Sequence, residues 1–177
     1  MKWSEAIKAY TDNLPTPASS AALAARLIPL IDLTALNDTD TESSVAALCE
    51  KAVTPLGNVA AVCVYPQFVP LVSAQLAGTS IKIATVVNFP EGQQSLTDVL
   101  IDISRALADG ANEIDVVIPY HRYLAGERHY LHDFVRAQHP IDDYGSALSK
   151  EFLYLKELYQ LQPAYGAVKF LRLRPAS

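Results

Sequence analysis

Four short apolar runs alternate with stretches of helical periodicity, and this alternation sharply limits the folds open to the chain. The runs are rich in β-branched residues and lie near residues 28–34, 58–65, 81–89 and 113–120. Apolar residues recur at helical spacing between them, over about 42–52, 67–76 and 96–107. Parallel strands need a crossover connection and, when covered on both faces, read as continuous apolar runs. The sequence therefore predicts βαβ units and an α/β fold with a parallel sheet.

Composition supports a folded domain and excludes several classes of partner. The 177 residues are 50% apolar and 19% charged, which suits one hydrophobic core. A net charge of −5 and a pI near 5.3 argue against nucleic acid or an anionic membrane as partner. No apolar run reaches the ~18 residues of a membrane helix, and the first residues lack the apolar region of a signal peptide. Cys49 and Cys63 lack metal-ligand spacing, so we expect a reducing, cytoplasmic setting.

A single carboxylate, Asp115, interrupts the last apolar run between Ile114 and Val116. A buried carboxylate without a partner is costly, so it either accepts a structural hydrogen bond or takes part in chemistry. The residues alone favour the structural interpretation. Cys63, in the second run, is by itself more often a small core residue. Asp32, at the end of the first run, could simply cap the loop that follows it.

Four motifs occur in order along the chain, each at the start or end of an apolar run. They are Leu30–Asn37 (LIDLTALN), Val62–Pro66 (VCVYP), Thr85–Pro90 (TVVNFP) and Glu113–Tyr120 (EIDVVIPY). Together they resemble the deoxyribose-phosphate aldolases, and the enterobacterial-type branch in particular, over about residues 27–136. Any one motif alone would be weak, but four in the right order are specific.

The resemblance implies a fold and a reaction. The family has a (β/α)8 TIM barrel, of which this chain would hold about the first four to five βα units. It is a family of class I aldolases, lyases that split 2-deoxy-D-ribose 5-phosphate into acetaldehyde and D-glyceraldehyde 3-phosphate through a Schiff base in deoxyribonucleotide catabolism. The implied ligand is therefore a small phosphorylated sugar or aldehyde, and neither a metal nor a cofactor is implied.

The resemblance also implies roles for three residues. In the family an aspartate on the fourth strand relays protons through water, and Asp115 occupies that position. Asp32 and Cys63 match positions on the first and second strands that line the substrate pocket. The chemistry further needs a neutral lysine whose pKa a second cation lowers, and the family carries these lysines on its sixth and seventh strands. The chain departs from the family after about residue 137 and lacks the motif K-T-S-T-G-K, so neither lysine has a counterpart.

Two lysines lie within apolar, strand-like runs of this chain. Lys82 stands near the start of the third run, at the end of a barrel strand that serves stability, so we expect it to be solvated. Lys169 lies in a run that is superficially similar to the Schiff-base strand. It is followed by Phe170 and Leu171 instead of small hydroxyl residues, so we do not expect it to be reactive.

The character of the sequence changes after Pro119. All four histidines fall between His121 and His139, without the carboxylates of a supported ligand set, so we expect no metal site. The tail reads as atypical and mostly helical, with a helix over 147–161 and a weakly specified strand over 167–175. Arg172 and Arg174 are expected to be solvated rather than bound to phosphate.

The tail also suggests an altered reading frame. A DNA sequence that encodes residues 170–177 can, when read from its third base, encode F-K-T-S-T-G-K. We therefore hypothesise a frameshift between about residues 136 and 170. On this hypothesis the chain has two parts: an N-terminal half of an aldolase barrel, residues 1–137, and a divergent, out-of-frame tail, residues 138–177.

Two functions follow from these observations. The first is a deoxyribose-phosphate aldolase by descent, with little or no activity because both catalytic lysines are absent. The alternative is a non-catalytic half-barrel pseudoenzyme that binds a phosphosugar or pairs with another aldolase subunit. A half barrel has two open strand edges, which invite pairing, so we expect a homo-oligomer formed through open sheet edges.

Overall fold

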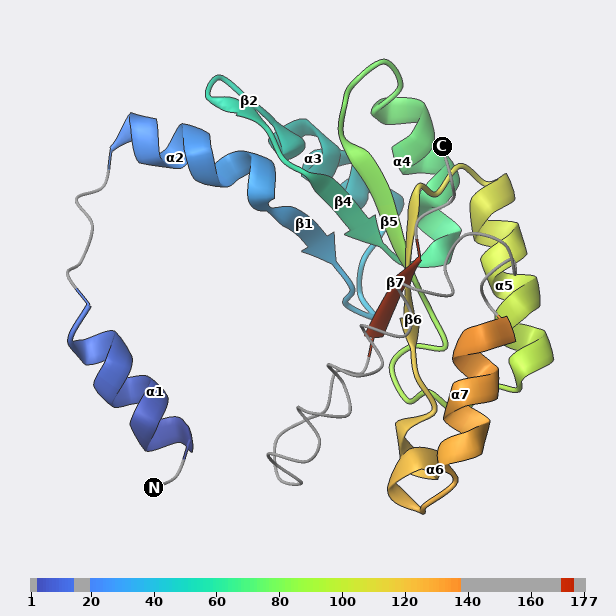
Figure 1. The fold of residues 1–177 in the computed structure, drawn as a ribbon. Helices are drawn as coiled ribbons and strands as arrows, with labels where there is room; N and C mark the ends of the chain where they lie inside the picture. Colours follow the sequence, from blue (N-terminus) through green and yellow to red (C-terminus); the bar gives the residue numbers. More distant parts are fainter. Residues whose placement is uncertain (1–2, 15–19, 138–169, 174–177) are drawn as a thin grey trace.

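A computed structural model describes residues 3–14, 20–137 and 170–173 of the chain (Figure 1). The helices are Trp3–Asp12 (α1), Ala21–Leu27 (α2), Ile28–Leu30 (η1, 3-10), Glu42–Ala52 (α3), Pro66–Phe68 (η2, 3-10), Val69–Gln75 (α4), Leu96–Ala108 (α5), Tyr120–Leu124 (α6) and Arg128–Ala137 (α7). The strands are Asp32–Ala35 (β1), Val53–Thr54 (β2), Gly57–Asn58 (β3), Ala61–Val64 (β4), Lys82–Val87 (β5), Glu113–Val117 (β6) and Phe170–Leu173 (β7). The predicted helix over 147–161 lies outside the described residues.

The main sheet has the strand order β1-β4-β5-β6-β7. Its first four strands are parallel, as the alternation of runs and helices predicted, and each connection carries a helix. The fifth strand, β7, pairs with β6 in the antiparallel direction, with Phe170 beside Val117 and Leu173 beside Ile114. The strand predicted in the tail is therefore present over residues 170–173. Among the described residues, the two edge strands of the sheet are therefore β1 and β7.

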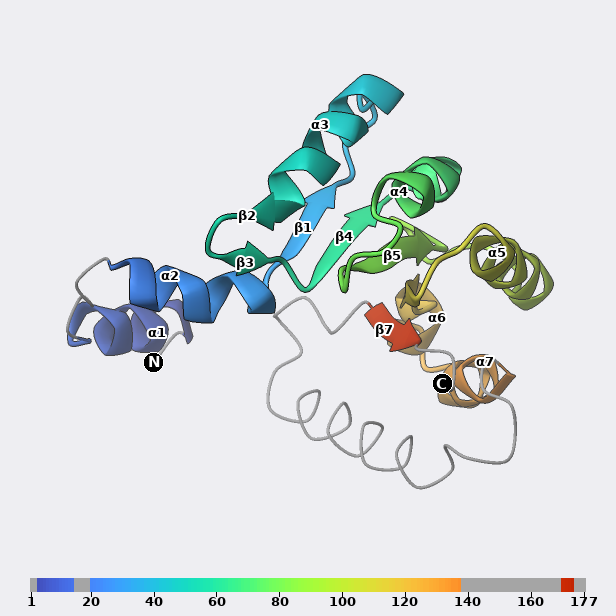
Figure 2. The same ribbon diagram turned by 90° about the horizontal axis from the view of Figure 1, so that it is seen from above.

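The helices cover one face of this sheet. Figure 2 shows α3, α4 and α5 along the same side of β1, β4 and β5. Val62 and Val64 of β4 point to that side and pack with Val45 of α3, Val69 of α4 and Val99 of α5, all fully buried. Complete burial of a valine side chain stabilises the fold by roughly 1.5–3 kcal/mol. The core of the protein therefore lies between the sheet and its three helices.

Hydroxyl side chains fix where the covering helices begin. The Thr41 hydroxyl accepts a hydrogen bond from the Ser44 amide (3.2 Å), and the Ser44 hydroxyl accepts one from the Thr41 amide (2.9 Å), which forms a capping box on α3. Ser95 caps α5 in the same way through the Asp98 amide (3.2 Å). Ser20 is the N-cap of α2, because its hydroxyl accepts from the Leu23 amide (3.1 Å).

All four predicted strands are shorter than the apolar runs that predicted them, and a local reason is visible for three of them. Residues 28–30 form η1 instead of strand, because Pro29 has no N–H for a ladder and its fixed φ suits a helical turn. Asn58 pairs with Val53 in the β2–β3 hairpin, so the strand predicted over 58–65 begins only at Ala61. The strand predicted over 113–120 ends at Val117, and Pro119 is already the N-cap of α6.

Candidate active site

The face of the sheet opposite the helices carries all three predicted site residues. Side chains alternate between the two faces of a strand, and residues in register on neighbouring strands share a face. Asp32 is in register with Ala61, and Cys63, two residues on, is in register with Ala84. Asp115 is in register with Val86, two residues beyond Ala84. Asp32, Cys63 and Asp115 therefore point to the same side, which we call the inner face.

A small apolar cluster lies on the inner face of the sheet and is distinct from the helix-covered core. Ala61, Cys63, Ala84 and Val86 pack together, with partly buried Leu36, Tyr65 and Phe89 beside them. Cys63 is only 3% exposed, as expected for a small core residue. Neither Cys63 nor Cys49 forms a disulfide.

Asp115 lies on β6 near the carboxyl end of the sheet. Its neighbours Ile114 and Val116 are fully buried on the helix side, so the carboxylate projects from the opposite face and is half-buried there. Two more residues of β6 follow it, whereas Asp32 is the first residue of β1. In barrel enzymes the reactive groups lie at the carboxyl ends of strands. By this criterion Asp115 is better placed for chemistry than Asp32.

A second carboxylate, Glu113, shares the inner face with Asp115. It lies two residues before Asp115, in register with Ala84, and is only 6% exposed. The sequence analysis did not single out Glu113, although the period-two spacing of Glu113 and Asp115 within β6 was a visible signal. The inner face of β6 therefore carries two carboxylates in succession.

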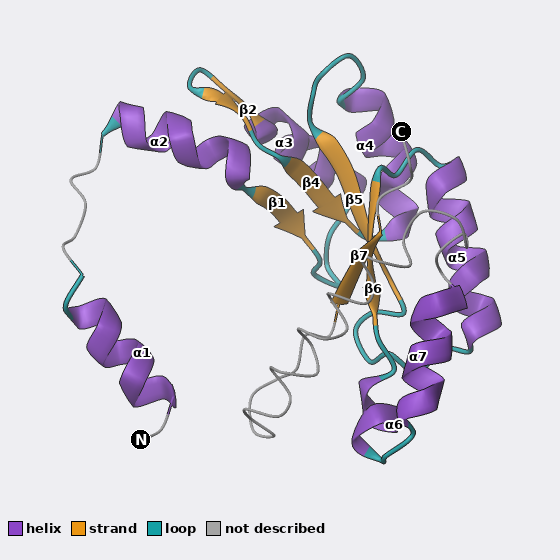
Figure 3. Cartoon of the chain, in the orientation of Figure 1, coloured by secondary structure: helices purple, strands orange, loops and turns teal. Residues whose placement is uncertain are grey.

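Hydrogen bonds fasten the loop after β5 to the end of β6. Figure 3 draws this loop in teal between β5 and α5. Asn88 has a left-handed backbone (φ 59°), and its side-chain amide donates a hydrogen bond to the Val117 carbonyl (2.7 Å). The Asn88 side-chain oxygen accepts from the Gln94 amide (2.8 Å), and its carbonyl accepts from the Gly92 amide (2.9 Å). Gly92 lies against the Ile118 carbonyl, where no side chain would fit. These contacts fix the loop that borders the carboxyl end of β6, and sequence reasoning missed the role of Asn88.

Tyrosine and acidic side chains border the carboxyl ends of the strands. The Tyr65 hydroxyl, just after β4, donates to the Asp38 carboxylate (3.5 Å), and the Tyr65 ring contacts Phe89 edge-on. Desolvation, and next to it the charge of Asp38, raises the pKa of Tyr65 above its usual value. The Tyr120 hydroxyl, after β6, donates to Glu91 in the β5–α5 loop (3.3 Å). The rim at this end of the sheet is therefore polar, acidic and aromatic.

Of the two lysines in strand-like runs, Lys82 is within the described residues, and it lies at the amino end of its strand. Lys82 begins β5, in register with Ala61, and is exposed, which confirms that it is solvated. Lys169 lies outside the described residues. His121 lies in α6, and His129 and His132 lie in α7. Over the described part of the chain, no group of three histidine, cysteine or acidic residues could hold a metal ion, and no helix is long and apolar enough to cross a membrane.

Comparison with known proteins agrees with these observations. A model of the DeoC/LacD family aldolases matches residues 26–138, close to the extent of the four motifs. A solved structure from Coccidioides immitis, assigned as a deoxyribose-phosphate aldolase, is 28% identical with a TM-score of 0.55, over 73% of this chain and 51% of that one. A structure from Toxoplasma gondii ME49, assigned in the same way, is 30% identical with a TM-score of 0.56, over 67% and 48% of the two chains.

The chain thus spans about half the length of the solved structures that it matches. Its parallel strands and alternating helices form part of a TIM-barrel fold, as the resemblance implied. The family model covers well over half of the 177 residues and includes every parallel strand of the main sheet. The chain therefore belongs to the DeoC/LacD aldolase family.

Proposed function

We propose that this chain is a deoxyribose-phosphate aldolase by descent, which carries the proton-relay side of the site but not the Schiff-base side. The position of Asp115 carries this proposal: it lies on the inner face of β6, near the carboxyl end of a sheet built from the family's own segment. A carboxylate held there with a water molecule can pass protons during carbinolamine dehydration and enamine formation. The substrate is 2-deoxy-D-ribose 5-phosphate, and the products are acetaldehyde and D-glyceraldehyde 3-phosphate.

Asp32 and Cys63 line the pocket in this proposal. Both share the inner face with Asp115, and Cys63 is buried in the apolar cluster beneath it. Glu113 extends the acidic wall of the same strand. In barrel enzymes the active site lies at the carboxyl ends of the strands. A phosphorylated sugar or aldehyde is the ligand that we propose for this site. The two cysteines without disulfides support a cytoplasmic setting.

The 177-residue chain has little or no retro-aldol activity in this proposal. A class I aldolase needs a neutral lysine to attack the carbonyl carbon, and neither family lysine has a counterpart in the sequence. We further propose that residues 1–137 are the half-barrel part and that residues 138–177 are a divergent tail, encoded out of frame. Sequencing the DNA that encodes residues 170–177 tests directly whether the tail is out of frame.

One observation favours the alternative, a non-catalytic half barrel that pairs with another aldolase subunit or binds a phosphosugar. The outer edge of β1 pairs with no other strand among the described residues. An unprotected edge is a template for a strand from another chain. A second chain that supplied the remaining strands would also supply the missing lysines.

A retro-aldol assay coupled to triose-phosphate detection tests the proposal. The purified 177-residue chain should give no turnover above the blank, and acetaldehyde with borohydride should trap no imine on any lysine in the mass spectrum. Stoichiometric trapping at Lys169, with turnover that Lys169→Ala abolishes, would refute the inactive chain. An inactive, folded chain that co-purifies with a full-length aldolase and binds it at a defined stoichiometry would favour the alternative.

A further inference from the structure

The edge of β6 that faces away from β5 is taken by a strand from the far end of the chain. Figure 1 shows this strand, β7, in red beside β6. Four residue pairs join the two strands in the antiparallel direction, from Ile114 with Leu173 to Val117 with Phe170. An unpaired strand edge presents N–H and C=O groups that any extended segment could bind. The backbone alone therefore does not explain why residues 170–173 take this place.

The two faces of β6 impose different demands on a strand that pairs with it. Ile114 and Val116 are fully buried in the apolar core on the helix side of the sheet. Glu113 and Asp115 alternate with them and place two carboxylates on the inner face. Residues directly opposite each other in an antiparallel pair interact on one face, where opposite charges stabilise the pair. A suitable partner strand therefore alternates apolar residues with cations.

The register gives β7 this alternation. Its two leucines are paired with Ile114 and Val116, the buried residues of β6. Arg172, which stands between the leucines, is paired with Asp115. A slip of one residue would move Arg172 opposite an apolar residue and would move a leucine opposite the carboxylate. The sequence of β7 therefore matches both faces of β6 in the register that the structure has.

We propose that the edge of β6 is a binding site for an extended segment that carries a cation, and that an ion pair between Arg172 and Asp115 makes β7 its occupant. Opposite residues of two paired strands have Cβ atoms about 4.5–5.5 Å apart. Arginine and aspartate side chains can span that separation with charge-assisted hydrogen bonds. The sequence alone led us to expect a solvated Arg172, because periodicity does not reveal which strand lies beside it. A separate peptide with the same alternation would bind this edge once β7 is displaced.

The pairing goes beyond the proposed function and does not depend on it. It requires only the register of β6 with β7 and the opposite charges of Arg172 and Asp115. Hydrogen exchange and peptide binding detect the pairing without any substrate. Failure of the pairing and failure of the proposed reaction are therefore separate observations.

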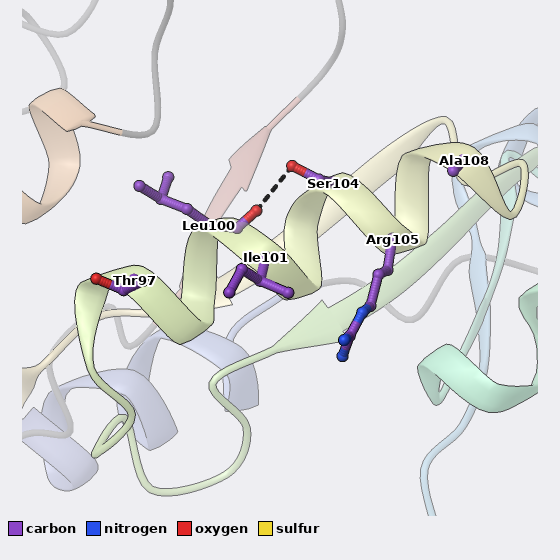
Figure 4. A pocket seen from close by; sticks show the side chains of 6 residues that line it. All are labelled: Thr97, Leu100, Ile101, Ser104, Arg105 and Ala108. Carbon is purple, nitrogen blue, oxygen red and sulfur yellow. Dashed lines mark hydrogen bonds between the residues drawn. The ribbon is translucent and has the colours of Figure 1, made fainter.

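A second surface could attract an apolar peptide, and it has to be distinguished from the edge of β6. The outer face of α5 forms a shallow groove of about 480 Å³, shown in Figure 4. Ile101 lies in this groove and is 43% exposed. The Ser104 hydroxyl donates to the Leu100 carbonyl of its own helix (2.9 Å). The described residues that line the groove include one cation, Arg105, and no carboxylate. A peptide would therefore find apolar contacts there but no partner for an arginine.

Hydrogen exchange of the 177-residue chain, followed by mass spectrometry, tests the pairing within the molecule. Arg172→Glu places a like charge opposite Asp115, so we expect the amides of residues 170–173 to exchange at least about tenfold faster than in the wild-type chain. Arg26→Glu, at an exposed arginine of α2, makes the same change in net charge and should leave this exchange unchanged. Continued protection of β5 shows that the sheet remains folded in each variant.

Two further variants test whether charge is the cause. Arg172→Lys keeps the cation and leaves Asp115 untouched, so residues 170–173 should exchange within about fivefold of the wild-type rate. The double variant Asp115→Arg with Arg172→Asp restores opposite charges across the same register. Its exchange should be slower than that of Arg172→Glu and close to that of the wild-type chain.

A peptide added to the protein tests the edge of β6 as a binding site. A fluorescein-labelled peptide of residues 167–175 should bind the Arg172→Glu chain, in which β7 is weakened, with a dissociation constant on the order of 100 μM. The same peptide with Arg172→Glu should bind at least about tenfold more weakly. Adding Ile101→Glu to the protein should leave binding of the first peptide unchanged, because Ile101 lies in the α5 groove.

Three results would overturn the proposal. The first is equal exchange of residues 170–173 in the Arg172→Glu and Arg26→Glu chains. The second is exchange as fast in Arg172→Lys as in Arg172→Glu, which would show that the cation is not needed. The third is peptide binding that Ile101→Glu abolishes and that is indifferent to the charge at position 172, which would assign the peptide to the α5 groove.

Discussion

Asn88 and Val117 are joined by a hydrogen bond of 2.7 Å from the Asn88 side-chain amide to the Val117 carbonyl. This bond connects the loop after β5 to the last residue of β6, two positions beyond Asp115. Asn88 is only 5% exposed, and its left-handed backbone directs the loop back over the strand end. The rim of the candidate site therefore depends on the hydrogen bonds of one buried asparagine.

We expect Asn88→Ala to lower the free energy of unfolding by about 2–4 kcal/mol, since it leaves the Val117 carbonyl and the Gln94 amide without their partner and forces alanine into a left-handed conformation. Urea denaturation followed by circular dichroism measures the change. Asn13→Ala, at an exposed asparagine that donates to the Ala9 carbonyl, should cost less than about 0.5 kcal/mol. Equal effects of the two substitutions would contradict the role of Asn88.

Gly92→Ala tests the close approach of the same loop to β6. A Cβ at Gly92 would collide with the Ile118 carbonyl and crowd the Val117 side chain, so we expect a loss of about 2–4 kcal/mol. Gly126→Ala is the control, because Gly126 also has a positive φ (94°) but open space around it, and it should cost about 1 kcal/mol. Thermal unfolding of both variants gives the comparison. If Gly126→Ala cost as much, the close contact at Gly92 would not be the cause.

The Cys49 thiol makes stability depend on pH in the alkaline range. Burial raises the pKa of Cys49, so the folded protein disfavours the thiolate. Its contribution is complete below the pKa of the unfolded chain, about 8.5, and is lost as the pH rises through the folded pKa. The stability advantage of the wild-type chain over Cys49→Ala should therefore shrink between about pH 7 and pH 9.5. A constant difference across this range would contradict the prediction, because it would mean that the thiol titrates alike in the folded and unfolded states.

Asp115→Asn tests the proton relay in a protein with the reading frame restored. If the DNA around residues 136–170 encodes F-K-T-S-T-G-K after correction, we expect retro-aldol turnover, and Asp115→Asn should reduce kcat by about 100-fold or more. Asp133→Asn, at an exposed carboxylate of α7, is the control and should leave kcat unchanged. Codons that exclude the motif in a shifted frame would end the frameshift hypothesis, and full turnover by Asp115→Asn would end the relay role.

Local patterns were enough to predict the sheet and one face of it. The period-two alternation around Asp115 separates Ile114 and Val116 from the carboxylate, and the structure places them on opposite faces. The caps of α3 and α5 are local in the same sense, since they join residues only three positions apart.

Long-range contacts could not be read from the sequence in the same way. The bond between Asn88 and Val117 joins residues that are 29 positions apart, and no local pattern announces it. The antiparallel direction of β7 is set by its pairing with β6, a strand far away in the sequence. The periodicity of residues 167–175 does not encode that direction. Pro29 was a local signal against a strand, but it lies within an apolar run that favoured one. The start of that run is a 3-10 helix.

The antiparallel pairing of β7 with β6 has a consequence for any attempt to rebuild a whole barrel from two chains. A barrel of this family continues with a parallel strand beside β6, yet that position is already taken by a strand running the other way. An added half barrel would first have to exchange with β7 along the four register pairs of Phe170–Leu173. We therefore expect an added half barrel to pair directly with β1 but to pair with β6 only after slow displacement of β7. The two strand pairings that complete the barrel would form at different rates.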